Sequence, residues 1–283
     1  MSLIWLAIAC SQAPLQGERP QLYVADLQAQ TVWSFQEGEA LEPLVTVASI
    51  PPEHRRDGFK PSALALAGED LLVANSDGGE IYRVDRATGE FLELLHDNGW
   101  GTLRLEEPCA LELLDGELLA LGNDTRNLLR ISPDPAELDA VLRSAHSMAI
   151  SQDEGLTWVG SAPSIRGQGL LQAWDLEQGV LAGELAPYPV LQSVTGLAVD
   201  RGLLWVADWF AQELVVLDPA TGERVGTPMG PEQLREPVDV MAFGEDIYLL
   251  ETQALWRLSP GRLPQPVPVP GLEYGRNMVA AWD

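Results

Sequence analysis

The chain has 283 residues, of which 46% are hydrophobic and 7% aromatic, so it can bury the core of one sizeable domain. It carries 42 Asp and Glu residues against 17 Lys and Arg residues, a formal net charge of -25. This charge argues against nucleic acid as a partner, because contact with phosphates requires clustered Lys and Arg.

Residues 1–10, MSLIWLAIAC, form an apolar run that ends at Cys10 and is too short to span a bilayer. Residues 11–20 form a polar linker. The run resembles a secretory signal with a bacterial lipobox, in which the cysteine becomes the lipidated first residue of the mature protein. No Lys or Arg precedes the run, so a mis-assigned start or an apolar chain end is the alternative. We expect a lipoprotein of the bacterial cell envelope, periplasm-facing or at the surface, that contacts the membrane only through this anchor.

From residue 21 the sequence repeats a unit of three short apolar runs separated by turns. The first unit, from Gln21, has only the second and third runs. Complete units begin at Pro61, Pro108, His146, Gly196 and Pro237. Each has an inner strand, a tight turn rich in Gly, Asp and Glu, a second strand, and then a third strand. The clearest copy is GLAVDRGLLWVADWFAQELVVLD, closed by a turn in which Asp218 accepts backbone N–H groups and Gly222 supplies a positive φ.

Corresponding positions of the units recur roughly 37 to 49 residues apart, close to the ~40–50 residues of a propeller blade. The tail from Tyr274, YGRNMVAAWD, contains an inner strand alone and complements the incomplete unit from Gln21. The sequence therefore predicts an all-β fold for residues 21–283. It is a six-bladed β-propeller with four-stranded antiparallel blades, closed by the C-terminal strand pairing with the N-terminal blade.

The residues that begin each inner strand are expected to ring the mouth of the central channel. We select as ligand-binding candidates Ser62, Cys109, His146, Thr195, Asp239, Arg276 and Asn277. Loops on the same face are expected to form an interaction face that includes Trp100, Arg166, Tyr188, Trp209 and Phe210. The alternative for these aromatic side chains is that they cap the ends of the sheets.

The repeats resemble those of NHL-type six-bladed propellers, and the match is strongest in LLWVADWFAQELVVLDPATG. It covers most of the chain from Gln21 and implies the fold rather than an activity. Acidic or amide residues recur at the ends of second strands, at Asp26, Asn75, Asp208 and Glu251. We expect them to cap the turns that follow rather than to ligate a metal.

The gluconolactonase-type propellers are related to this group, and resemblance to them implies a divalent cation held by Glu, Asn and Asp at the starts of inner strands. Here only Asp239 and Asn277, each displaced by one residue, could serve, and Arg276 beside them opposes a cation. We therefore expect no metal and no other cofactor; calcium is the ion that the resemblance would allow. Cys109 and His146 could also act as thiolate and base, although a buried cysteine is commonly inert.

These observations predict a monomeric, extracytoplasmic, non-catalytic scaffold that binds a small polar ligand or a protein partner through its loop face and channel mouth. The alternative is a divergent metal-dependent lactonase or esterase of the gluconolactonase-like group. A third hypothesis, assembly with envelope partners, requires Trp209 and Phe210 as anchors, because large aromatic side chains dominate interface energetics.

Overall fold

A computed structural model describes residues 19–55, 58–98, 104–114, 116–123, 127–131, 137–141, 145–151, 155–161, 169–185 and 191–282. Within the strands, the side chains of residues 127, 137–141, 145, 146 and 148–151 lie outside this description. The lipobox-like segment with Cys10, most of the linker, and Trp100, Arg166 and Tyr188 also lie outside it.

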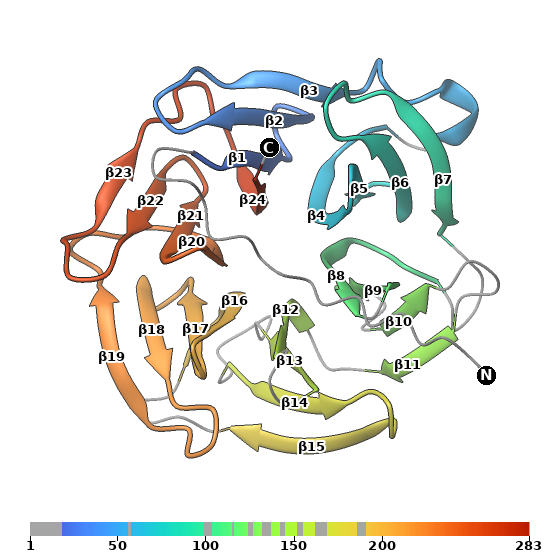
Figure 1. Ribbon diagram of the computed structural model, residues 1–283. Coiled ribbons are helices and arrows are strands. Elements are labelled where there is room, and N and C mark those ends of the chain that lie inside the picture. Colours follow the sequence, from blue (N-terminus) through green and yellow to red (C-terminus); the bar gives the residue numbers. More distant parts are fainter. Residues whose placement is uncertain are drawn as a thin grey trace, which may run out of the picture.

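Six four-stranded antiparallel sheets stand around a central channel, which confirms the predicted six-bladed propeller (Figure 1). We name the sheets blades A to F. Blade A is β24 (Gly275–Ala281), β1 (Gln21–Asp26), β2 (Thr31–Gln36) and β3 (Glu42–Thr46). Blade B is β4 (Pro61–Ala67), β5 (Asp70–Asn75), β6 (Glu80–Asp85) and β7 (Phe91–Asp97). Blade C is β8 (Pro108–Leu114), β9 (Glu117–Gly122), β10 (Asn127–Ile131) and β11 (Glu137–Val141).

The other three blades follow in chain order, each again built from the channel outward. Blade D is β12 (Ala145–Ser151), β13 (Leu156–Ser161), β14 (Leu171–Asp175) and β15 (Val180–Leu185). Blade E is β16 (Val194–Asp200), β17 (Leu203–Asp208), β18 (Glu213–Leu217) and β19 (Arg224–Met229). Blade F is β20 (Pro237–Phe243), β21 (Asp246–Glu251), β22 (Leu255–Leu258) and β23 (Gln265–Val267).

Blade A closes the ring in the predicted way. The C-terminal strand β24 pairs antiparallel with β1, with Leu22 opposite Ala280 and Val24 opposite Met278. In Figure 1 the red end of the chain lies between the blue strand β1 and the channel. Backbone N–H groups of Glu273 and Tyr274 also donate to the Asp26 carboxylate, at 2.7 and 3.0 Å. Pairing of these two distant segments leaves β1 without an unpaired edge and gives blade A four strands like the others.

The six inner strands, β4, β8, β12, β16, β20 and β24, are each seven residues long and share one irregularity. In every one the pairing with the neighbouring strand shifts at the second residue, as in a β-bulge. Three of them begin with proline, at Pro61, Pro108 and Pro237. Proline fits the first position of a strand, because no ladder hydrogen bond is needed from its nitrogen.

Apolar side chains fill the spaces between adjacent blades. One cluster joins Leu22 and Val24 of blade A to Val238 and Leu250 of blade F. Another joins Ala63 and Ala65 of blade B to residues of blade C that include Leu111. The core is therefore a ring of inter-blade layers, each stabilised by removing apolar surface from water.

The turn from Asp218 to Gly222 has the predicted structure. The Asp218 carboxylate accepts the N–H groups of Ala220 and Thr221, at 2.8 and 3.4 Å, and Gly222 has φ +72°. The short 3-10 turn η1 (Pro52–His54) is the sole helical element in the part of the chain described. None of the described segments is a helix with the length and apolar character needed to cross a bilayer.

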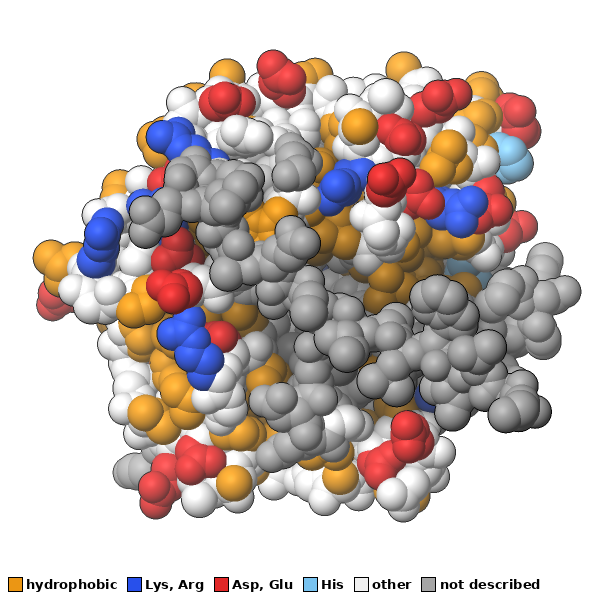
Figure 2. Space-filling model, viewed as in Figure 1, with side chains coloured by type: hydrophobic (Ala, Val, Ile, Leu, Met, Phe, Trp, Pro, Cys, Tyr) orange, Lys and Arg blue, Asp and Glu red, His pale blue; other side chains and the backbone are white. Residues whose placement is uncertain are grey.

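Acidic side chains are spread around the molecule rather than gathered in one patch of the view in Figure 2. Several form ion pairs with arginines, such as Glu117 with Arg130 at 2.5 Å. Ion pairs that are open to solvent on at least one side each contribute little to stability. Water weakens the interactions of charges on the surface, so individual charges have their largest effect in the interior of the channel.

Candidate binding channel

A cavity of about 800 Å³ runs along the inner strands. At the starts of these strands its lining is polar and includes Cys109, Thr195, Asp239, Arg276 and Asn277. At their far ends its lining is apolar and includes Leu66, Leu114, Met241 and Phe243. The cavity is therefore amphipathic, with a size and composition typical of small-molecule sites.

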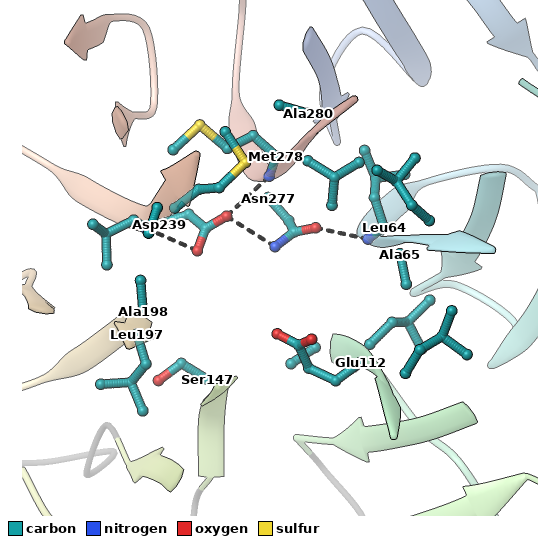
Figure 3. A pocket seen from close by; sticks show the side chains of 18 of the residues that line it. Leu64, Ala65, Glu112, Ser147, Leu197, Ala198, Asp239, Asn277, Met278 and Ala280 are labelled. Atoms are coloured by element: carbon teal, nitrogen blue, oxygen red, sulfur yellow. Dashed lines mark hydrogen bonds between the residues drawn. The ribbon is translucent and has the colours of Figure 1, made fainter. Parts of the chain in front are cut away.

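A chain of hydrogen bonds crosses three blades at the polar end. Asn277 donates from its side-chain nitrogen to Asp239 at 2.9 Å, and its side-chain oxygen accepts the N–H of Leu64 at 2.7 Å (Figure 3). Met278 and Val240 each donate a backbone N–H to the same Asp239 carboxylate, at 2.9 Å. Blades F, A and B are thus joined by polar contacts at the place where the ring closes.

Burial raises the pKa of Asp239 to about 7, although three N–H donors and the charge of Arg276 act in the opposite direction. The donors hold the carboxylate in one orientation and occupy both of its oxygens. Asp239 is therefore a fixed group of the channel wall that changes charge near neutral pH.

Glu112 lies deeper in the channel, on β8, and faces the Asp239–Asn277 pair across the cavity (Figure 3). Burial, with the negative charge of Asp239 as a second cause, raises the pKa of Glu112 to about 8. It is the fifth residue of its inner strand, and the fifth residues of the other inner strands are Ala65, Ala149, Ala198, Met241 and Val279. Among the fifth residues of the six inner strands, Glu112 is thus the one with an ionisable side chain.

Ser147 adds a hydroxyl group to the cavity lining. It is the third residue of β12, is 4% exposed, and its Oγ has no hydrogen-bond partner among the described residues. A buried hydroxyl without a partner costs free energy unless a ligand or water satisfies it. The sequence places Ser147 beside His146 at the entry of its inner strand, although it is not among the selected ligand-binding candidates. Glu112 is missed, although alignment of the inner strands shows it as the polar exception among the fifth residues.

The other mouth candidates have different roles. Ser62 is buried and donates to the carbonyl of Pro108 in blade C at 2.5 Å, and it does not line the cavity. Thr195 makes the same kind of contact between blades E and F, donating to the carbonyl of Pro237 at 2.9 Å, and it does line the cavity. Both hydroxyls therefore tie one blade to the next.

Cys109 lines the cavity, and its burial raises the pKa of its thiol to about 12. A thiol with this pKa is protonated at neutral pH and is a poor nucleophile. Arg276 lies at the mouth, with its guanidinium 6.0 Å from the centroid of the Tyr274 ring. The side chain of His146 is outside the description, so the arrangement of Cys109 with His146 stays a prediction.

The residues that end second strands have a structural role that extends beyond the expected turn caps. Asp208 is 1% exposed and accepts the N–H of Ala211 in the next turn, but also those of Gln192 and Ser193 before β16. Glu251 accepts the N–H groups of Arg235 and Glu236, before β20, and not those of its own turn.

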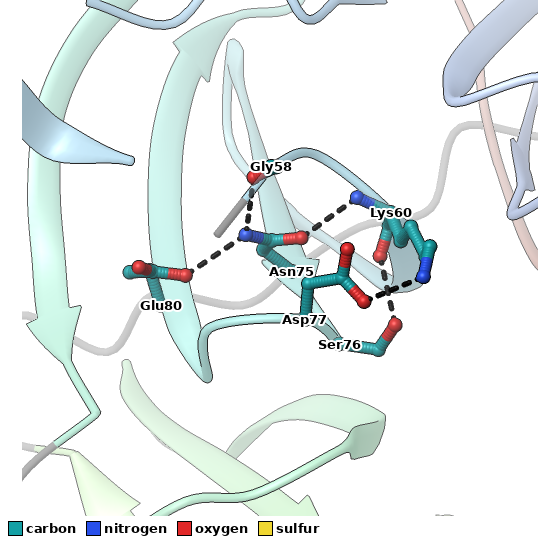
Figure 4. A network of polar contacts seen from close by, with 6 residues as sticks. All are labelled: Gly58, Lys60, Asn75, Ser76, Asp77 and Glu80. Atoms are coloured by element: carbon teal, nitrogen blue, oxygen red, sulfur yellow. Dashed lines mark hydrogen bonds and ion pairs between the residues drawn. The ribbon is translucent and has the colours of Figure 1, made fainter. Parts of the chain in front are cut away.

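Asn75, at the end of β5, also bonds the backbone before an inner strand, here with an amide side chain (Figure 4). Its side-chain oxygen accepts the N–H of Lys60 at 2.7 Å, and its nitrogen donates to the carbonyl of Gly58 and to Glu80, both at 2.9 Å. Lys60 also forms an ion pair with Asp77 at 2.8 Å. These polar side chains fasten the loop before an inner strand to the strand beside it, so they shape the mouth of the channel.

Two aromatic residues of the predicted interaction face follow β17. Trp209 is half-buried against the cluster between blades A and F, and its backbone N–H donates to Ser193 just before β16. This contact places the turn on the channel-mouth side of the blade. Phe210, next in the chain, is 63% exposed.

Within the described residues, no three His, Cys, Asp or Glu side chains form a group that could hold a metal ion. The oxygens of Asp239 are engaged by N–H donors, which a cation would have to displace. The side chains described around the channel therefore do not present the hard oxygen ligand set that calcium requires.

The chain matches no family model and no curated protein. Among solved structures it is similar to a chain of the crystal structure of a nidogen/laminin complex, with a TM-score of 0.71 and 12% sequence identity. The match covers 93% of this chain and 98% of that chain. At this identity the likeness shows the propeller fold alone, which hosts many unrelated functions. The NHL-type and gluconolactonase-like resemblances stay predictions.

Proposed function

We propose that the protein is a non-catalytic scaffold that binds a protein partner on the loop face around its channel mouth, with Phe210 as the central anchor. The observation that carries this proposal is a large aromatic side chain, 63% exposed, on a turn that the rest of the blade holds in place. An aromatic side chain on a rigid turn loses little conformational entropy on binding, and such side chains are frequent anchors of interfaces.

The turn that presents Phe210 is held on both sides. Asp208 accepts the N–H of Ala211, and the indole of Trp209 packs on the inter-blade cluster. Gln212 donates from its side chain to the carbonyl of Arg235 in the adjacent loop, at 2.9 Å. A partner would therefore meet a surface that needs little ordering on binding.

The similarity to a propeller from the nidogen/laminin complex is compatible with such a role, because that propeller belongs to a protein complex. We propose further that the protein acts as a monomer outside the cytoplasm, anchored by a lipid on Cys10. The support for this location is the apolar run of residues 1–10, which ends in Ala9 and Cys10. Incorporation of labelled palmitate in cells, lost in Cys10→Ser, tests the anchor separately from the binding role.

Site-specific photocrosslinking tests the binding role. A photoreactive phenylalanine analogue replaces Phe210 in one variant and Leu263 in a control, and each is illuminated in the native host. Leu263 is 85% exposed in the turn between β22 and β23, where the alternation of strands places it on the opposite face.

We expect one reproducible adduct from position 210 that is absent from position 263. A second pair of variants, Phe210→Ala and Leu263→Ala, tests the same partner by co-purification, which only Phe210→Ala should reduce. Equal crosslinking from both positions, or from neither, would contradict the proposal.

A further inference from the structure

We propose that the channel is a binding site for a small organic ammonium ion, whose charged group meets Glu112 and whose apolar part occupies the far half of the cavity. This site is separate from the protein-binding face around Phe210, and either can exist without the other.

The first argument is that Glu112 lacks a partner. Among the described residues it forms no hydrogen bond and no ion pair, while it lies in a cavity of about 800 Å³. The side chain is half-buried and lines the channel, where a cation or a set of donors would offset the cost of desolvating its carboxylate. The other fifth residues of the inner strands are apolar, so no described neighbour at that level can supply a donor side chain.

The second argument is the balance of charge around Glu112. The described titratable groups on the facing inner strands are Asp239 on β20, Arg276 on β24, and Cys109 on its own strand. Only Asp239 acts on Glu112, and it raises the pKa of that carboxyl, whereas the charge of Arg276 acts on Asp239 and Cys109. When Glu112 is ionised, no described cation offsets its charge, whereas Asp239 has Arg276 nearby.

The third argument selects an organic cation over a metal ion. Three N–H groups already engage the Asp239 carboxylate, so among the described residues that line the channel Glu112 is the carboxylate without a hydrogen bond. One carboxylate is too few for calcium or magnesium but suits an ammonium group, which donates up to three hydrogen bonds. The buried hydroxyl of Ser147, on the adjacent blade, has no partner in the described part of the chain and provides a second polar group in the same cavity.

The fourth argument concerns the rest of the ligand. At the level of Glu112 and beyond it, the cavity lining includes Leu66, Leu114, Met241 and Phe243, which favour an alkyl or aryl group over a second polar group. A polyamine with several charges would leave a cation among these side chains. A monoamine with a short apolar body fits both halves of the channel.

Isothermal titration calorimetry with n-hexylammonium, 1-hexanol and hexanoate tests the proposal. The proteins compared are the wild type, Glu112→Gln, and Glu223→Gln, a control that removes one exposed carboxylate from the turn between β18 and β19. Circular dichroism and thermal midpoints confirm that each variant is folded. Calcium chloride is titrated in a parallel arm.

We expect n-hexylammonium to bind the wild type and Glu223→Gln equally, and Glu112→Gln at least tenfold more weakly. Binding should strengthen from pH 6 to pH 8 and then level off, because the cation requires the ionised form of Glu112. The proposal is overturned by equal binding to Glu112→Gln, by equal binding of 1-hexanol, or by no binding of n-hexylammonium. It is equally overturned if calcium binds through Glu112 in place of the amine.

Discussion

Asp239 of blade F and Asn277 of blade A are joined across a blade boundary by a hydrogen bond of 2.9 Å. The same amide reaches blade B through its oxygen, which accepts the N–H of Leu64. Because β24 is the strand that closes the ring, these bonds stabilise the one blade whose strands are far apart in the sequence. The polar end of the channel thus contributes to architecture as well as to a candidate site.

The first prediction concerns coupling between these two residues. Asp239→Ala and Asn277→Ala should each lower the midpoint of urea unfolding, because each leaves buried N–H groups without an acceptor or removes a bridge between blades. Residues in direct contact usually show coupling of about 0.5 to 3 kcal/mol in a double-mutant cycle. We expect the double variant to lose less than the sum of the single variants.

The matched control for this cycle pairs Asp239→Ala with Asp218→Ala, which lies in an exposed turn of blade E and shares no hydrogen-bond partner with Asp239. That pair should be additive. Additive behaviour of Asp239 with Asn277 as well would show that the bridge does not contribute to stability.

The second prediction is the dependence of stability on pH. The pKa values of Asp239 and Glu112 are raised to about 7 and about 8, so the folded protein binds protons that the unfolded chain has already released above about pH 4. The free energy of unfolding contributed by these groups should therefore fall as pH rises from about 4 to about 8, by at most about 1.4 kcal/mol per pH unit for each group.

Glu112→Gln removes one of these two titrations. Urea unfolding of this variant should show a shallower decline between pH 5 and pH 8 than the wild type, and the variant should be the more stable of the two at pH 8. Parallel pH profiles for the two proteins would contradict the assignment of a raised pKa to Glu112.

The third prediction concerns the close approach of blades E and F. A Cβ atom on Gly196 would lie 2.5 Å from the Asp239 Cα and 2.7 Å from the Val240 nitrogen, both of which are backbone atoms. Gly196→Ala should therefore separate the two inner strands and cost about 1–3 kcal/mol or more, as overpacking does in other cores. Gly183→Ala is the control, since nothing lies within 4 Å of its added Cβ, and it should change the unfolding midpoint little.

The fourth prediction concerns the buried carboxylate that ends β17. Asp208→Ala leaves the N–H groups of Gln192, Ser193 and Ala211 without their acceptor, at a position that is 1% exposed. We expect a loss of about 1–3 kcal/mol for each group that stays buried and unpaired. Hydrogen exchange should show the loop before β16 opening first. Asp218→Ala, which removes an acceptor from an exposed turn, should cost about 1 kcal/mol or less.

The fold could be predicted because each blade repeats the same local pattern. The turn at Asp218, the spacing of the inner strands and the incomplete units at the two ends are all visible in the sequence, and the pairing of β24 with β1 confirms the predicted closure. The repeating pattern sets strand order because neighbouring strands in a blade are also neighbours in the chain.

The candidate site was less predictable, because its properties depend on distances between blades. Asp239 and Asn277 were selected by position, but their hydrogen bond depends on how blades F and A pack. Glu112 was missed because a single Glu in PCALELLDG resembles the solvent-facing residue of an ordinary strand. Only the ring brings it opposite Asp239 and raises its pKa.

Blade A also determines when the protein can finish folding during synthesis. Its β1–β3 hairpins emerge first, but Asp26 and Glu273, which bond directly, are separated by 247 residues. At ~5–20 residues translated per second, β1 waits ~12–50 s for its partner strand. During that interval the nascent chain exposes an unpaired apolar edge, which makes it a candidate client for chaperones until β24 is made.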